Sequence, residues 1–391
     1  MLEWVTSEDA EKLSKTDLKA YYINMLPNVI LGILGILFST NIIIVIISFL
    51  WLIMPIFMWY ISRKEDEKEP LSKLTEQDKQ YVFNVGKKTW EYFKDTLTEE
   101  NNYLPPDNYQ ADRKEVLAKR TSPTNIGLAL LTVISSYDLA YEKLENVLDL
   151  LQKMTNTIEK LSKWNGHLYN WYNIETLEPL FPRYISVVDS GNFIGYVYVL
   201  KQFYIEIKEK IENKELDESL FKYIPDWAEK PIEQIPFAKA DFSKLYDYEK
   251  QLFSIGFNIE ENKLTDSYYD LLASEARSAS LIAIAKKDVP SKNWYNLSRT
   301  LTTLNGYKGL VSWSGTAFEY LMPNIIIKKY KGSLLDESCK FMIMSQKEYA
   351  KRLGVLWGFS ETAFNVKDLN KNYQYKAIRN TMAWLKKRVR R

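Results

Sequence analysis

Residues 266–285 read DSYYDLLASEARSASLIAIA, and this stretch shows the pattern on which the fold depends. After a polar start, small and apolar residues recur at helical spacing, so we expect a helix over residues 269–285. Ser122 and Pro123 suit the cap and first turn of another helix. Similar patterns predict helices over residues 75–96, 123–141, 144–161, 192–211, 293–304, 316–329 and 334–352. Alternating β-branched residues are scarce, so the expected fold class is all-α.

The N-terminal part of the chain carries an uncharged run from Ala20 to Ser62. A bilayer core requires about 20 apolar residues per helix. The run is therefore long enough for two spans, with a polar turn near residues 39–41. Lys and Arg on both flanks favour a transmembrane hairpin with both ends in the cytoplasm. The less favoured alternative is a buried hairpin in the core of a soluble protein.

The composition divides the chain into segments of different character. We expect a cytoplasmic segment at residues 1–19, the membrane region at 20–62, a charged linker at 63–74, an α-helical domain at 75–377 and a basic tail at 378–391.

Charge and residue counts exclude several functional classes. The chain has 391 residues, with 52 Lys and Arg against 50 Asp and Glu, so its net charge is only +2. This balance argues against a nucleic-acid partner. The single cysteine and single histidine exclude an internal disulfide, a Cys/His zinc site and HExxH chemistry. No glycine-rich phosphate loop is present, and we expect neither a cofactor nor a metal.

Several loops combine aromatic residues with amide, carboxylate and hydroxyl groups. Examples are RTSPTNIG (residues 120–127), GHLYNWY (166–172) and PRYISVVDSGN (182–192). Such loops, mounted on a helical scaffold, can hydrogen-bond sugar hydroxyls while aromatic rings cover the apolar sugar faces. The residues that we expect to contact a sugar are Arg120, His167, Asn170, Trp171, Tyr172, Arg183, Asp189, Tyr269, Trp313, Glu319 and Trp357.

Many of these residues also have a structural interpretation. Asp189 is equally expected as the cap of a helix that starts near Asn192. Glu319 is either a rival catalytic carboxylate or a buried, paired glutamate. His167 is either a substrate contact or a satisfied structural histidine. The arginines either orient sugars and carboxylates or form structural salt bridges, and the tryptophans are either sugar platforms or core residues.

Two further stretches are SWSGTAFEYLMP (residues 312–323) and WGFSETAFN (357–365). Together with the quoted loops, they resemble the glucoamylase-like region of the cyclic β-1,2-glucan synthases. The resemblance covers roughly residues 75–377. It implies an (α/α)6 barrel and a retaining transglycosylase that closes linear β-1,2-glucan into rings. It also implies that Glu275 is the acid/base and that Glu361 is the nucleophile.

Both glutamates have alternatives in the sequence itself. Glu275 lies among small and apolar residues, which would raise its pKa and suit a general acid. Otherwise it is a surface glutamate paired with Arg277. Glu361 follows a turn-like segment that can present a carboxylate, or it is a first-turn glutamate behind the cap Ser360.

Three departures from the family pattern predict a truncated fragment with an incomplete barrel. Residues 212–240 are short of helices, a basic tail replaces the expected glycine-rich continuation after Tyr375, and the synthase's other domains are absent. The sequence thus leaves three functions open, which are a β-1,2-glucan transglycosylase, an endo-β-1,2-glucanase and an inactive glucan-binding fragment. The expected partners are β-1,2-glucan or a related oligosaccharide, the lipid bilayer and other parts of a split synthase. The expected location is the cell membrane, with the soluble domain in the cytoplasm.

Overall fold

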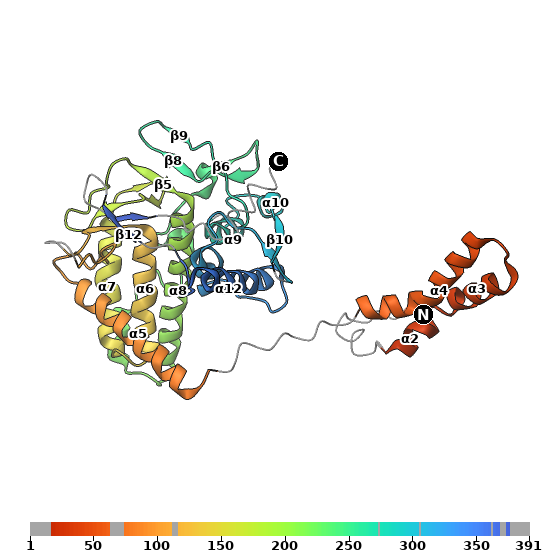
Figure 1. Cartoon of the computed structure of the whole chain (residues 1–391). Coiled ribbons are helices and arrows are strands. Elements are labelled where there is room, and N and C mark those ends of the chain that lie inside the picture. Colours follow the sequence, from red (N-terminus) through yellow and green to blue (C-terminus); the bar gives the residue numbers. More distant parts are fainter. Residues whose placement is uncertain are drawn as a thin grey trace. The chain divides into compact units, whose positions relative to one another are not determined.

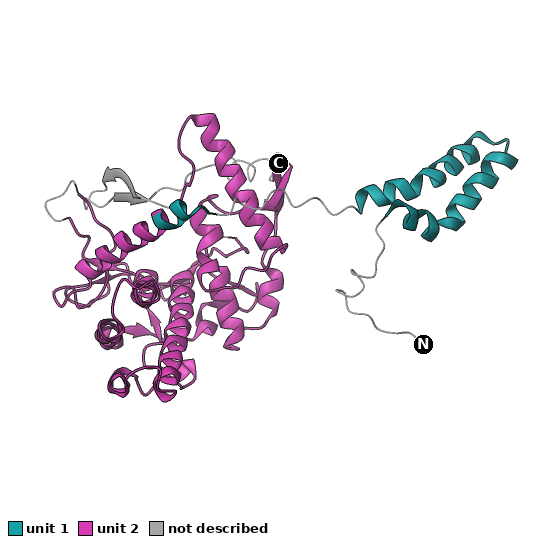
Figure 2. Ribbon diagram, turned by 90° about the horizontal axis from the view of Figure 1, so that it is seen from below, with its two compact units in different colours: residues 1–80 teal, residues 81–391 magenta. Residues whose placement is uncertain are grey.

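A computed structural model describes residues 17–62, 74–111, 116–272, 274–304, 306–360, 363–367 and 373–375. The chain divides into two compact units, residues 1–80 and residues 81–391, which are coloured teal and magenta in Figure 2. The predicted charged linker and basic tail fall almost entirely outside the described residues.

The first unit contains a helical hairpin. Helices α2 (Leu18–Asn24) and α3 (Leu26–Phe38) precede α4 (Ile42–Ile61), and α3 packs along α4. A Cβ atom at Gly35 would collide with the Ser48 hydroxyl, so glycine permits this close approach. The helices break at residues 39–41, as predicted.

One helix of the hairpin, α4, is long and apolar enough to cross a membrane. Helices α2 and α3 reach that length only as a pair, which is bent by 73° at the break between them. Length and composition therefore support one membrane span, formed by α4. They support a second only if the bent pair of α2 and α3 forms a single span.

In the second unit, α6 (Pro123–Asp138), α7 (Leu144–Lys160) and α8 (Val187–Glu212) lie side by side (Figure 1). Helix α5 (Glu76–Thr96) precedes them, and its first turn belongs to the first unit. Helix α9 (Arg277–Ala285) packs against α8. Helix α12 (Leu334–Leu353) packs on a β-hairpin and on the short helix α11 (Ala317–Leu321). A further short helix is α10 (Lys292–Asn296).

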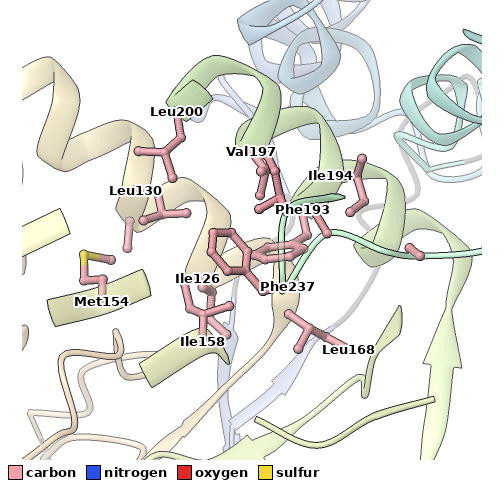
Figure 3. Packing of buried hydrophobic residues seen from close by; sticks show 14 of the residues in the cluster. Ile126, Leu130, Met154, Ile158, Leu168, Phe193, Ile194, Val197, Leu200 and Phe237 are labelled. Carbon is pink, nitrogen blue, oxygen red and sulfur yellow. The ribbon is translucent and has the colours of Figure 1, made fainter. Parts of the chain in front are cut away.

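The main hydrophobic core lies between α6, α7 and α8. Each helix supplies apolar residues at three- and four-residue spacing, which places them on one face. Figure 3 shows Ile126 and Leu130 from α6, Met154 and Ile158 from α7, and Phe193 and Val197 from α8 packed together with Phe237.

The strands are short and antiparallel, and they lie at the loops. The pairs are β1 (Arg120–Thr121) with β4 (Tyr172–Asn173), β2 (Lys163–Trp164) with β3 (His167–Leu168), β6 (Tyr246–Asp247) with β7 (Leu252–Phe253), β10 (Leu301–Leu304) with β11 (Tyr307–Leu310), and β12 (Ala363–Lys367) with β13 (Tyr373–Tyr375). The three-stranded sheet has the order β5 (Tyr184–Ser186), β8 (Gly256–Asn258), β9 (Lys263–Leu264). Helices build the core, so the all-α prediction is confirmed.

The predicted helices over 75–96, 123–141, 144–161 and 334–352 are observed within a few residues. The Ser122 hydroxyl caps α6 by accepting from Asn125 N at 3.2 Å, as expected. Helix α8 begins earlier than predicted because the Ser186 hydroxyl caps it, accepting from Asp189 N at 3.2 Å.

Three helix predictions were wrong over part of their length. Helix α9 starts only at Arg277, because Ser274 adopts a left-handed backbone with φ +52°. The range 293–304 ends in strand β10, and the Asn-Gly sequence that follows it is a strong hairpin signal. Helix α11 gives way to a 3-10 turn at Met322–Ile325, where Pro323 lacks a backbone donor.

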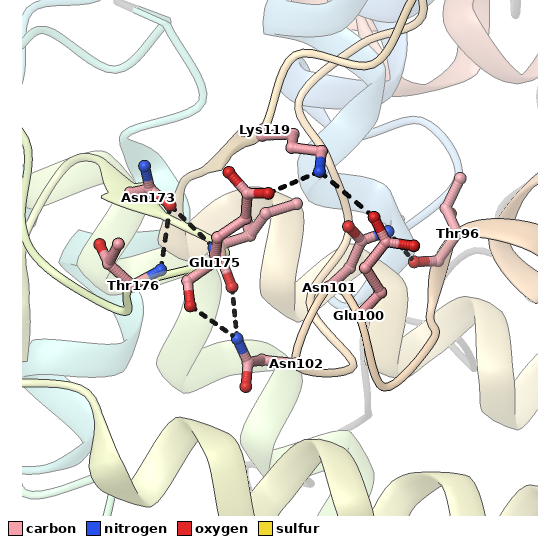
Figure 4. Close-up of polar contacts among 9 residues, drawn as sticks. Thr96, Glu100, Asn101, Asn102, Lys119, Asn173, Glu175 and Thr176 are labelled. Atoms are coloured by element: carbon pink, nitrogen blue, oxygen red, sulfur yellow. Dashed lines mark hydrogen bonds and ion pairs between the residues drawn. The ribbon is translucent and has the colours of Figure 1, made fainter.

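The loops that carry the candidate residues are tied together. Lys119 Nζ donates to Glu175 Oε1 at 2.6 Å and to Glu100 Oε1 at 3.4 Å (Figure 4). Asn102 Nδ2 donates to Ile174 O at 2.8 Å and to Glu175 O at 3.1 Å. These bonds brace the pairing of β1 with β4, so Arg120 and the segment around Trp171 are held at defined positions.

Helices α8 and α9 meet without spare volume at Gly191, where a Cβ atom would lie 2.3 Å from Ala279 Cβ. We expect Gly191→Ala to lower the free energy of unfolding by about 1–3 kcal/mol, because the helices must separate. Adding Ala279→Gly should restore only part of the loss, since the Ala279 backbone also lies within 2.4 Å of the new atom. Urea unfolding of both variants measures the effect, and an unchanged midpoint for Gly191→Ala would contradict the close packing.

Candidate active site

Glu275 lies immediately before α9 and is 4% exposed. Its Oε1 accepts from Asn192 Nδ2 at 3.0 Å, and Ser274 Oγ donates to Oε2 at 2.5 Å. The guanidinium of Arg277 instead donates to Glu319 O and Tyr320 O, at 2.8 and 2.6 Å. Glu275 is therefore a buried carboxyl group and not a surface glutamate paired with its neighbour.

Burial, together with the nearby carboxylate of Asp189, raises the pKa of Glu275 to about 7. A carboxyl group with such a pKa is about half protonated at neutral pH, so it can both supply and take up a proton during a reaction. This is the behaviour required of a general acid.

Asp189 lies in the first turn of α8, whose cap is Ser186, so Asp189 is not the helix cap that the sequence also allowed. Its Oδ1 accepts from Thr124 Oγ1 at 2.6 Å. Asn192 Nδ2 donates to the same hydroxyl at 3.2 Å as well as to Glu275. Burial raises the pKa of Asp189. The two carboxyl groups thus belong to one buried polar network.

Arg120, Asn170 and Trp171 adjoin this network. The Arg120 side chain donates from Nε and Nη2 to Asp107 Oδ2 at 3.2 and 3.1 Å, and its guanidinium lies 4.6 Å from the centroid of the Trp171 ring. The Asn170 amide, oriented as its neighbours require, donates to Asp189 Oδ2 at 3.0 Å and accepts from Trp171 Nε1 at 3.1 Å. Asn170 therefore contacts Asp189 directly, Trp171 contacts Asn170, and Arg120 lies over the Trp171 ring.

Tyr269 and Trp313 form an aromatic stack, with ring centroids 5.6 Å apart and planes inclined by 24°. Tyr269 is 8% exposed, whereas Trp313 is 41% exposed. Burial raises the pKa of the Tyr269 hydroxyl well above its usual value, and Glu275 and Asp189 add to the effect. The stack thus joins the buried carboxyl groups to an aromatic ring that is open to solvent.

His167 and Tyr172 occupy structural positions. His167 is 1% exposed, and its Nδ1 and Nε2 lie 2.9 Å from Ser190 Oγ and 2.9 Å from Asp241 O. Burial lowers its pKa to about 4, so the ring is neutral. Tyr172 is fully buried, and its hydroxyl donates to Ser162 O at 2.6 Å. Both side chains support the loops from within the core instead of facing a ligand.

Glu319 is also structural. Its carboxylate accepts from the Ser312 hydroxyl at 2.7 Å, from Gly315 N at 2.9 Å and from Thr316 N at 3.2 Å. It forms a capping box with Thr316 at the start of α11. With its oxygens occupied in this way, Glu319 holds the loop that carries Trp313.

Arg183 and Trp357 lie at more exposed positions. Arg183 Nε donates to Glu260 Oε1 at 2.9 Å, which makes it a partner in a surface ion pair. Trp357 is 51% exposed, and the ammonium group of Lys347 lies 4.8 Å from its ring centroid. Neither contacts the network around Glu275 through the bonds described above.

Glu361 lies outside the described residues. The chain leading to it is held at Phe359, whose carbonyl accepts from Ala317 N and Gln346 Nε2, both at 2.8 Å. The proposed nucleophile therefore follows a segment that is anchored to α11 and α12.

Sequence reasoning missed Thr124, Asn192 and Ser274. A usable signal existed for Asn192, because Asp189 and Asn192 are three residues apart on α8 and share a helix face. Thr124 and Ser274 carry no comparable signal, since their roles depend on contacts between distant parts of the chain.

Comparison with known proteins agrees with the motifs. The chain is 28% identical, over an alignment 491 positions long, to the cyclic β-(1,2)-glucan synthase NdvB of Rhizobium meliloti. The chain is similar to a cyclic β-1,2-glucan synthase. The match covers 96% of this chain but only 17% of that synthase. The resemblance inferred from the sequence motifs is confirmed, while no protein-family profile matches.

The fold resembles solved glucoamylase-like structures. A candidate glucoamylase from Bacteroides fragilis superposes with a TM-score of 0.60 at 15% identity, over 79% of this chain and 75% of that one. An endo-β-1,2-glucanase from Chitinophaga pinensis, solved with sophorotriose and glucose, gives a TM-score of 0.58 at 14% identity, over 78% of this chain and 75% of that one. The predicted α/α-barrel type of fold is confirmed.

The raised pKa of Glu275 predicts a stability effect that does not require activity. A folded-state pKa of about 7 exceeds the usual 4.5, so the folded protein binds this proton more tightly than the unfolded chain does. The carboxyl group therefore destabilises the fold increasingly between these pH values, by up to about 3 kcal/mol above pH 7. We expect Glu275→Gln to remove this cost and to raise the melting temperature at pH 8 but not at pH 4.5.

Glu260→Gln is the control for this measurement. The guanidinium of Arg183 lowers the pKa of Glu260, so its replacement should lose stability at high pH instead of gaining it. Equal melting temperatures of wild type and Glu275→Gln across the pH range would contradict a perturbed Glu275.

Proposed function

We propose that the chain is a membrane-anchored protein that acts on β-1,2-glucan by a retaining double displacement, as a transglycosylase that closes rings. The observation that carries this proposal is the buried Glu275, which has a pKa of about 7 and lies beside a solvent-open aromatic stack. The similarity to the glucan synthase supplies the substrate class and the roles of both glutamates.

In the first step, a carboxylate oxygen of Glu361 attacks the anomeric carbon, and the bond from that carbon to the glycosidic oxygen breaks. Glu275 transfers its proton to the departing oxygen. In the second step, the ionised Glu275 takes the proton of an acceptor hydroxyl, whose oxygen displaces Glu361 from the anomeric carbon. Retaining chemistry of this kind requires the two carboxyl groups to lie about 5–5.5 Å apart.

The acceptor determines the product. A hydroxyl at the far end of the same glucan chain gives a ring, and water gives a shorter linear chain. The second candidate function is therefore an endo-β-1,2-glucanase, which the structural similarity to such an enzyme favours. Both functions use the same pair of glutamates.

Sugar contacts are assigned by position. Trp313, stacked on Tyr269, is the proposed platform for an apolar sugar face. Arg120, Asn170 and Trp171 are proposed to line the substrate path next to Asp189, and Trp357 to provide a further platform close to Glu361. We assign no direct sugar contact to the buried His167, Tyr172 and Glu319, or to Arg183.

The proposed location is the cell membrane. The hairpin 20–62 spans the bilayer, residues 1–19 and the soluble domain 75–377 face the cytoplasm, and residues 63–74 link the two parts. The basic tail 378–391 follows the domain. Other parts of a split synthase are proposed as partners.

Incubation of the purified full-length chain, in lipid nanodiscs, with linear β-1,2-glucan tests the proposal. Mass spectrometry distinguishes rings, which lack one water relative to linear oligomers of the same length. Rings support the transglycosylase, and short linear products support the glucanase. Glucan binding in calorimetry without any new product identifies an inactive glucan-binding fragment and refutes both enzymatic functions.

A further inference from the structure

The donor and the acceptor of each hydrogen bond around Glu275 can be assigned in turn, beginning at Trp171. The indole Nε1 can only donate, so the Asn170 oxygen, 3.1 Å away, must accept. The other end of the Asn170 amide then donates to Asp189 Oδ2 at 3.0 Å. This oxygen of Asp189 is therefore an acceptor and carries no proton.

The same assignment of donors and acceptors extends to the Thr124 hydroxyl. Asn192 Nδ2 can only donate, and it lies 3.2 Å from Thr124 Oγ1, which accepts. The hydroxyl proton of Thr124 is then free to be donated to Asp189 Oδ1 at 2.6 Å. Both oxygens of Asp189 accept, which is the pattern of an ionised carboxylate.

The last bond reaches Glu275. The second hydrogen of the Asn192 amide points to Glu275 Oε1 at 3.0 Å, so this oxygen also accepts. Ser274 Oγ donates to Oε2 of the ionised carboxylate at 2.5 Å. When Glu275 is protonated, the proton lies on Oε2 and this bond reverses, so that the Ser274 hydroxyl oxygen accepts. We infer that Asp189 is a positioning residue that acts through Thr124 and Asn192 to confine the acid proton of Glu275 to Oε2.

The inference rests on the proposed function of Glu275 as the acid. It adds a residue that selects which oxygen delivers the proton. The required members are all on rigid elements: Thr124 is in the first turn of α6, while Asp189 and Asn192 are in the first turns of α8. Asn192 is 1% exposed, so water does not compete for its amide.

The charges around Glu275 agree with this assignment. Asp189 and Tyr196 face it from α8, Tyr269 from the preceding loop and Arg277 from α9. Arg277 is engaged by backbone carbonyl groups, and the tyrosine hydroxyls are neutral because burial raises their pKa. An ionised Asp189 therefore opposes ionisation of Glu275, and the two groups titrate as a coupled pair.

Thr124→Val tests the relay, because it removes the hydroxyl while keeping the shape and the charge of the site. We expect kcat on linear β-1,2-glucan to fall about a hundredfold, as for a displaced catalytic group, with KM little changed. Thr132→Val on the same helix is the matched control, because its hydroxyl donates only to Leu128 O at 2.8 Å. If Thr124→Val loses no more kcat than Thr132→Val, the inference that Asp189 acts through Thr124 is overturned.

Asp189→Asn gives a readout that is independent of turnover. The free energy of unfolding of Asp189→Asn is measured against pH and compared with that of the double variant Asp189→Asn/Glu275→Gln. Because the two proteins differ only at Glu275, the pH at which their difference changes reports the ionisation midpoint of Glu275. We expect this midpoint to lie about one pH unit lower than the midpoint obtained with Asp189 intact, because a like charge has been removed. An unchanged midpoint overturns the inference.

The two failures can be told apart. If Glu275→Gln retains full turnover, the proposed function fails, while the midpoint still reports whether Asp189 controls Glu275. If Glu275→Gln is inactive but neither Thr124→Val nor Asp189→Asn changes kcat or the midpoint, only the inference fails.

Discussion

Replacing Glu275 with Gln is expected to lower the turnover of linear β-1,2-glucan about a thousandfold, which is within the range for loss of a general acid. The amide keeps the shape of the side chain, and its oxygen can still accept from Asn192, so the fold is preserved. What disappears is the proton for the departing oxygen. The measurement is kcat from timed product analysis, with circular dichroism as a check on folding.

Two further measurements sharpen this result. A substrate with a leaving group that needs no protonation should restore the first step in Glu275→Gln, and a glycosyl-enzyme should then accumulate. Glu361→Gln should form no such intermediate with the same substrate, because it lacks the attacking carboxylate. Glu260→Gln, in the surface ion pair with Arg183, should keep the wild-type rate. Ring formation that persists in both glutamate variants would refute the assignment of roles.

The largest expected loss of stability comes from Glu319→Ala. This change leaves the Ser312 hydroxyl and the backbone N–H groups of Ser314 and Thr316 without their buried acceptor. An unsatisfied buried donor costs about 1–3 kcal/mol, so we expect the free energy of unfolding to fall by about 3–5 kcal/mol in total. Urea unfolding at neutral pH measures this change.

Glu337→Ala is the matched control, because Glu337 stands in the first turn of α12 but pairs only with Lys340 at the surface. It should change the free energy of unfolding by less than about 1 kcal/mol. Glu319→Ala should also weaken glucan binding, since the loop it holds carries Trp313. A loss for Glu319→Ala as small as that of the control would show that the loop does not depend on this carboxylate.

Much of the fold follows from local patterns in the sequence. Apolar spacing located α5, α6, α7 and α12, and the uncharged run located the hairpin. The errors occurred where distant contacts determine the local structure. Residues 269–272 and 274–276 are not helical, since Ser274 turns the chain so that Glu275 meets Asn192. No window along the sequence contains that contact.

The candidate site could be predicted only in part for the same reason. Asp189 and Glu275 stood out by residue type and by resemblance, whereas Thr124 and Asn192 look like ordinary helix residues. Residue type makes Glu319 a rival carboxylate to Glu275, while its apolar neighbours equally indicate a buried, paired glutamate. Their hydrogen bonds separate them, since backbone N–H groups donate to the Glu319 carboxylate, whereas the Asn192 and Ser274 side chains donate to that of Glu275.

The contact between Gly191 and Ala279 limits how such a site can be redesigned. Asn192 and Glu275 stand on either side of it, so their spacing is set by two backbones that touch and not by adjustable side chains. Single substitutions at the contact between α8 and α9 are therefore expected to do little to admit bulkier sugar donors. Redesign would have to replace the contacting segments of both helices together.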